Sequence, residues 1–175
     1  MHNDFVLLGP PDDPAGARVE RLEAALAAIA RHGRFVSRGD DSGTHKRERA
    51  LWEMAGIDPK NIATLEETGQ GMGATLDIAS ERQSYTLSDR GTYLALRKRL
   101  DLDVVFEGEP PLRNVYSMYV VNPEKHARAK PEPARRLIAF FSEPEIQRRI
   151  GEFRRKEFGR SLFVPDVVPG SREGT

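Results

Sequence analysis

The chain has 175 residues, of which 38% are hydrophobic and 31% are charged, and it contains no cysteine. This length supports one ordinary domain or two small lobes with a real core. Lys plus Arg and Asp plus Glu balance at 27 each, so we expect no general attraction to nucleic acid or to an anionic membrane. The absence of cysteine excludes disulfides, thiolate metal sites and a cysteine nucleophile. No apolar run approaches the ~20 residues that span a bilayer, so the chain is not expected to be membrane-spanning.

The first part of the chain alternates strand-like and helix-like segments. The opening "DFVLLGP" has the pattern of a buried strand. Apolar residues at helical spacing from Val19 to Ile29 predict a helix that stops at Gly33. The strand-like "RFVS" follows, and after a polar run a second helix is expected from Thr44 to Ala55.

The remaining segments continue the alternation. A Gly-rich loop precedes a short helix through Leu76, "SYTLSD" reads as a strand, and a helix is expected from Asp89 to about Leu100. "LDVVFEG" is another strand and "NVYSMYVVNP" is the longest β-like run. Two helices are expected around 133–142 and 143–153. Strands alternating with helices predict an α/β fold with a largely parallel sheet.

The polar run within "FVSRGDDSGTHKRERALW" combines several hydrogen-bond donors ahead of a helix. Asp41 or Ser42 can cap that helix, which leaves the first N–H groups, those of Ser42, Gly43 and Thr44, without an internal partner. Those donors, the helix dipole, two hydroxyls and Arg38 together favour a negatively charged ligand. Gly43 would let such a ligand approach the backbone closely.

The same run has a purely structural interpretation, in which the helix is capped and Arg38 pairs with a nearby Asp. Catalytic interpretations have less support. The neighbouring His45, Ser42 and Asp40 do not form a triad by proximity in sequence, and the G-x-S-x-G and P-loop patterns are absent. Four scattered His predict no metal cluster, so neither a catalytic site nor a cofactor is expected. The arginine pairs of the last third are interleaved with Glu, which is typical of solvated helix faces rather than of a nucleic-acid site.

A second glycine-rich run, "GQGMGAT", also precedes a predicted helix. Gly71, Met72 and Gly73 would expose another row of backbone amides, although such a run can also be a tight loop that needs positive φ angles. An open parallel sheet gathers helix starts on one edge, where ligands bind. The two runs together therefore favour an anion site more than either does alone.

Three stretches, "MHNDFVLLGPPDDPAG", "FVSRGDDSGTHKRERALW" and "ETGQGMGATLDIASERQSYTLSDRGTYL", closely resemble the tungstate-binding proteins of bacterial ABC importers. These belong to the two-lobed periplasmic solute-binding proteins for oxyanions, and the resemblance covers nearly the whole chain. The segment from Arg38 to Thr44 also resembles the R-x-D-x-S-G-T run of phosphate-binding proteins. The resemblance implies a periplasmic-binding-protein-like α/β fold of type II, with one lobe complete and the other partial.

The resemblance also implies a division of the chain. The expected segments are a first hinge strand over 1–10, a complete second lobe with the anion site over 11–113, a return hinge strand over 114–122, the C-terminal part of the first lobe over 123–164, and a tail over 165–175. The first lobe normally begins with a Thr/Ser-rich ligand loop that has no counterpart here. We therefore expect the N-terminal half of the first lobe to precede Met1. We also expect this chain to bind tungstate weakly and to expose apolar residues such as Leu137, Ile138 and Phe141.

The implied ligand is tungstate or a similar oxyanion, and the implied partner is the membrane permease of an ABC transporter, in the periplasm or another extracytoplasmic space. Tungstate carries no proton at neutral pH, so its site should offer donors only. The resemblance and this chemistry select Arg38, Ser42, Gly43, Thr44, Gly71, Met72 and Gly73 as ligand-binding residues. Asp40 would orient Arg38, and Asp41 would cap the helix. Molybdate and phosphate remain alternatives, as does the ligand-sensing domain of a transcription regulator, which shares the two-lobed fold.

Overall fold

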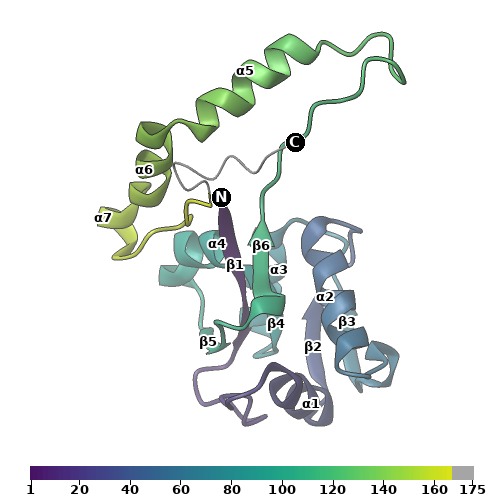
Figure 1. Ribbon diagram of the computed structural model, residues 1–175. Helices are drawn as coiled ribbons and strands as arrows, with labels where there is room; N and C mark the ends of the chain where they lie inside the picture. Colours follow the sequence, from purple (N-terminus) through teal and green to yellow (C-terminus); the bar gives the residue numbers. More distant parts are fainter. Residues whose placement is uncertain (167–175) are drawn as a thin grey trace. The chain divides into compact units, whose positions relative to one another are not determined.

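The computed structural model describes residues 1–166 and divides into two units (Figure 1). The central unit is Asp4–Arg113, and the terminal unit combines Met1–Asn3 with the residues from Asn114 onward. Two paired strands, β1 (His2–Gly9) and β6 (Arg113–Val115), carry the chain from one unit to the other. Among the described residues, no helix has the length and apolar character needed to cross a membrane.

The central unit is built on a sheet in which β1 is the middle strand. It lies between β4 (Thr86–Asp89) and β5 (Asp103–Phe106) and is antiparallel to both. A second pair, β2 (Arg34–Ser37) and β3 (Thr64–Glu67), is parallel. One parallel bridge between Phe35 and Tyr85 joins β2 to the start of β4, so the two sheets form one layer.

Two predictions about the strands need correction. The sheet is mixed, because β2, β3, β4 and β5 run in one direction but β1 lies antiparallel between β4 and β5. The helical connection between β2 and β3 keeps these two strands parallel. The alternation of strands and helices along the sequence does not reveal that β1 lies between β4 and β5. The expected strand over 114–122 ends at Val115. Residues 116–122 are mostly exposed and pair with no strand among the described residues.

The helices of the central unit agree closely with the sequence pattern. The first ends at Gly33, which has φ +80° and the left-handed conformation of a helix stop. It begins at Leu22, later than the pattern from Val19 suggested. The α-helices are α1 (Leu22–His32), α2 (Gly43–Met54), α3 (Met72–Glu81) and α4 (Arg90–Leu96), with short 3-10 turns η1 (Pro59–Asn61), η2 (Arg97–Arg99) and η3 (Pro110–Leu112).

Both faces of the sheet are buried, and this follows from the side-chain alternation along β1. Phe5 and Leu7 belong to a core that includes residues of α1 and α2, whereas Val6 and Leu8 belong to a second core with residues of α3 and α4. The result is a three-layer unit, which confirms the expected α/β fold. Because α2 follows β2, α3 follows β3, and the two strands are parallel, both helix starts lie at the same edge of the sheet.

The described residues of the terminal unit form three helices, α5 (Pro131–Ser142), α6 (Pro144–Glu152) and α7 (Arg155–Phe158). The first two confirm the helices expected around 133–142 and 143–153. No apolar side chain among the described residues of this unit is buried. Leu137 is exposed as expected, whereas Ile138 and Phe141 are half-buried. Most of the predicted tail, from 167 onward, lies outside the described residues.

Candidate functional site

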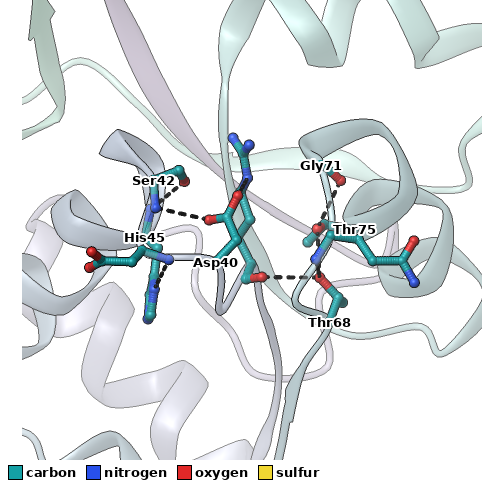
Figure 2. A network of polar contacts seen from close by, with 9 residues as sticks. Asp40, Ser42, His45, Thr68, Gly71 and Thr75 are labelled. Carbon is teal, nitrogen blue, oxygen red and sulfur yellow. Dashed lines mark hydrogen bonds and ion pairs between the residues drawn. The ribbon is translucent and has the colours of Figure 1, made fainter.

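Two loops at one edge of the sheet lead into helices. Residues 38–42 connect β2 to α2, and residues 68–71 connect β3 to α3. The Thr68 N–H donates to the Ser37 carbonyl at 3.0 Å, and the Thr68 hydroxyl donates to the Arg38 carbonyl at 3.2 Å (Figure 2). These bonds extend the parallel pairing of β2 and β3 into the loops, so the starts of α2 and α3 are held side by side.

Arg38 is paired with Asp40 within the first loop. Arg38 Nε lies 2.7 Å from Asp40 Oδ2. The two groups form an ion pair, but the Nε–H group is not aligned for a hydrogen bond. The other carboxylate oxygen accepts the N–H of Ser42 at 3.1 Å. Burial alone would raise the pKa of Asp40, but the Ser42 hydroxyl and N–H, together with Arg38, lower the pKa below its usual value. Asp40 is therefore ionised at neutral pH and holds the guanidinium in place.

The helix cap of α2 is Ser42, whose hydroxyl oxygen accepts the His45 N–H at 3.4 Å. The expectation that Asp41 caps this helix is wrong. Asp41 lies one position too early, with φ +55° and an exposed carboxylate, and its N–H donates to His45 Nδ1 at 3.0 Å. The left-handed backbone at Asp41 turns the chain into the helix, so its side chain does not reach the first helical N–H groups.

Fewer backbone donors remain at the start of α2 than the sequence suggested. The Ser42 N–H is occupied by Asp40, which leaves the N–H groups of Gly43 and Thr44 as those without a partner inside the helix. The Thr44 side chain is buried, whereas Gly43 is exposed. A Cβ atom added at Gly43 would meet nothing within 4 Å, so packing does not require glycine there.

The start of α3 is capped differently. Gly71 is the N-cap and provides no side-chain bond, so the N–H groups of Met72 and Gly73 are open to a ligand. The Met72 side chain is buried in the core, and only its backbone can take part. Thr75 Oγ1 donates to the Gly71 carbonyl at 3.2 Å and lies 3.0 Å from Thr68 Oγ1, which fixes this helix start from inside (Figure 2).

The structure adds residues that sequence reasoning missed. Thr68 connects the two loops, and Thr75 of α3 contacts Thr68. The only sign of these two residues in the sequence is their place around the glycine run. Gly39 has φ +62°, and a Cβ atom there would lie 2.8 Å from the Cβ of Glu67, so glycine is needed for both conformation and space. Glu48 of α2 is buried, and burial raises its pKa to about 7. The sequence signal for the burial of Glu48 is its position four residues after Thr44, on the helix face that carries Leu51 and Trp52.

No group of three or more His, Asp or Glu among residues 1–166 is placed to hold a metal ion.

The sequence matches the PBP superfamily domain over residues 1–145. The chain belongs to the PBP superfamily. It is 39% identical over 172 residues to the tungstate-binding protein TupA of Peptoclostridium acidaminophilum, an alignment that covers 96% of this chain and 60% of that protein. This PBP-superfamily chain thus spans less than two thirds of the length of that relative.

Two solved structures extend the comparison to the fold. The tungstate-binding protein TupA from Desulfovibrio alaskensis G20 is 39% identical and superimposes with a TM-score of 0.81, covering 96% of this chain and 69% of that one. The tungstate ABC transporter protein from Geobacter sulfurreducens is 44% identical with a TM-score of 0.74, covering 87% of this chain and 66% of that one. The two-lobed resemblance inferred from the sequence is therefore confirmed at the level of the superfamily fold.

Proposed function

We propose that this chain binds tungstate or a similar tetrahedral oxyanion and serves as the substrate-binding component of an ABC importer. One observation carries the proposal: the starts of α2 and α3 are held side by side through Thr68, with Arg38 fixed between β2 and α2 by Asp40. Relatives and solved structures named for tungstate binding support the choice of ligand.

The chemistry of the site suits an anion that only accepts hydrogen bonds. Two helix N-termini contribute N–H groups and the positive ends of two dipoles. Arg38 adds a permanent positive charge and several donors, and the Ser42 hydroxyl lies at the start of α2. The carboxylate of Asp40 already accepts from Ser42 and pairs with Arg38, so it is occupied by protein donors. This arrangement favours a fully deprotonated anion such as tungstate or molybdate.

The proposal assigns a transport role without catalysis. The anion would be held by the central unit, within the second lobe expected over 11–113, and β1 and β6 would carry the chain between lobes. The partner would be the membrane permease of the importer, met in the periplasm or another extracytoplasmic space.

Phosphate is the second candidate, because a carboxylate stands beside the arginine of the R-x-D-x-S-G-T run. Hydrogen phosphate carries a proton that a carboxylate could accept. Calorimetric titration of the chain with tungstate, molybdate, sulfate and phosphate at pH 7.5 separates the candidates. We expect tungstate and molybdate to bind with similar affinity and more tightly than phosphate. A clear preference for phosphate would show that phosphate, and not tungstate, is the ligand.

A further inference from the structure

Glu48 is a carboxylic acid in an unusual place. It lies on the buried face of α2 together with Thr44, Leu51 and Trp52, and only 4% of its surface is exposed. Glutamate is rarely buried to this extent unless its carboxyl group has specific partners. The anion site described above does not use it.

The partners of Glu48 belong to the segment that enters the anion site. Its carboxyl group contacts the Ser37 hydroxyl, the Arg38 backbone N–H and the Trp52 indole N–H. The buried Ser37 hydroxyl and Trp52 indole have no partner with full hydrogen-bond alignment in the described residues, so these two contacts are loose. The Arg38 carbonyl is meanwhile bonded to the Thr68 hydroxyl. The backbone of Arg38 thus lies between Glu48, which its N–H approaches, and the second loop, which its carbonyl binds.

Other charged groups surround Glu48. It lines a cleft of about 610 Å³, and Glu67 of β3 raises its pKa further through repulsion. On β4, which packs against α2, the charged residue is Asp89, whose carboxylate is bonded to Thr92 at the start of α4. The remaining charged or titratable residues of the cleft are His45, Arg49, Glu53, Asp58 and Lys60.

We propose that Glu48 is a positioning residue of the anion site, which holds the Ser37–Arg38 segment against α2 and whose charge sets how tightly the site holds a dianion. The inference rests on the proposed function. It goes further by naming a buried group that makes the site sensitive to protons although the ligand itself does not titrate near neutral pH.

The electrostatic argument follows from the position of Glu48 on the helix. Thr44, whose N–H is one of the open donors at the start of α2, precedes Glu48 by one helical turn, a Cβ separation of about 5–6 Å. Burial raises the pKa of Glu48 to about 7, so the neutral form prevails below pH 7 and the carboxylate prevails above it. A buried carboxylate near the site repels a dianion with little screening. Anion affinity therefore falls as the pH rises through 7.

The first test is calorimetric titration with tungstate at pH 6 and pH 8. We expect affinity about fivefold higher at pH 6, at the lower end of typical coupling between two sites. In Glu48→Gln the amide oxygen can still accept from Ser37 and Trp52, and the affinity should be the same at both pH values. A pH dependence that persists in Glu48→Gln would overturn the proposal.

The matched control is His45→Asn. Histidine is the other side chain of this cleft that normally titrates between pH 5 and 8, and Asn can accept the Asp41 N–H that His45 Nδ1 accepts. We expect His45→Asn to keep the fivefold difference. Loss of the difference in this variant, with retention in Glu48→Gln, would assign the effect to His45 instead.

A second readout needs no substituted chain. Trp52 is the only tryptophan and contacts Glu48, so its fluorescence should titrate with a midpoint near pH 7. Since coupling is reciprocal, saturating tungstate should move the midpoint up by about 0.7 pH unit, the logarithm of a fivefold effect. If tungstate binds but leaves the midpoint unchanged, the inference fails and the proposed function stands. If tungstate does not bind at any pH, the proposed function fails and the inference fails with it.

Discussion

Asp40 has two opposite effects on Arg38. Its carboxylate fixes the direction of the guanidinium, but it also neutralises part of the charge that should attract an anion. Such an arrangement is useful only if alignment of the arginine matters more than its unopposed charge. The planar guanidinium of arginine gains most from alignment, because it loses less side-chain freedom for each hydrogen bond that it forms.

Asp40→Asn tests this balance. We expect the substitution to weaken tungstate binding, since Arg38 loses its ionic partner and the Ser42 N–H loses a charged acceptor. The ratio of tungstate to phosphate affinity should stay the same, because the Asp40 carboxylate is already occupied by Ser42 and Arg38. Calorimetry with both anions measures this ratio. A loss confined to phosphate would mean that Asp40 accepts a ligand proton.

Two glycines, one in the loop before α2 and one at the first position of α2, offer a matched pair. Gly39 has a positive φ angle and no room for a Cβ atom, whereas Gly43 has open space. Gly39→Ala should lower the free energy of unfolding by about 1–3 kcal/mol, the usual strain of a forced conformation. Gly43→Ala should leave stability nearly unchanged but weaken tungstate binding, because the added methyl group stands where the anion approaches. Chemical denaturation and calorimetry on both variants distinguish these effects, and equal destabilisation would contradict the structure.

The geometry of the candidate site was predictable where its chemistry is local. The helix start at Ser42–Thr44 follows from helix capping, and the partnership of Asp40 with Arg38 follows from the charges in one short run. Thr68 and Glu48 could not be found in this way. Their roles depend on the pairing of β2 with β3 and on the face of α2 that is buried, and both are tertiary features.

At the scale of elements, the sequence pattern identified β1, β2, β4 and β5 and the helices around them. It missed β3, whose sequence TLEE is half exposed and ends in two acidic residues. The pairing of β3 with β2 and the burial of neighbouring Ile62 hold it in place instead. The direction of β1 was also beyond the pattern, because a strand buried on both faces looks the same whether its neighbours are parallel or antiparallel.

Helix α2 should make stability depend on pH. The pKa of Glu48 is about 7 in the folded chain against 4.5 for the unperturbed group, so the folded state holds this proton more tightly. The free energy of unfolding therefore falls as pH rises from about 4.5 to 7, by on the order of 3 kcal/mol. Denaturation between pH 5 and 8 should show this fall in the native chain and a flatter profile in Glu48→Gln. Equal profiles would contradict the buried, protonated state of Glu48.

At the scale of the whole molecule, the two units differ in their cores. All described apolar side chains that are buried belong to the central unit, whereas the terminal unit exposes large ones such as Leu137, Phe140 and Phe153. Exposed apolar side chains in such number are unusual for a soluble monomer. With a net charge of zero, there is also little repulsion between copies.

We therefore expect the chain to associate with itself. Light scattering over a range of protein concentrations should show an average mass that rises above 19.6 kDa. Replacing Leu137 and Phe140 with Ser should lower that mass, whereas replacing the exposed Met54 of the central unit should not. A constant monomeric mass in the native chain would show that the apolar residues of the terminal unit do not drive association.

The central claim, that Arg38 and the two helix starts form an oxyanion site, is tested most directly by tungstate titration of the native chain beside Arg38→Ala. A charge-assisted contact of roughly 1.5–3 kcal/mol predicts affinity at least tenfold weaker in Arg38→Ala. Arg38→Lys should recover only part of the loss, because an ammonium group lacks the planar fork. Equal affinity of the native chain and Arg38→Ala would contradict the account.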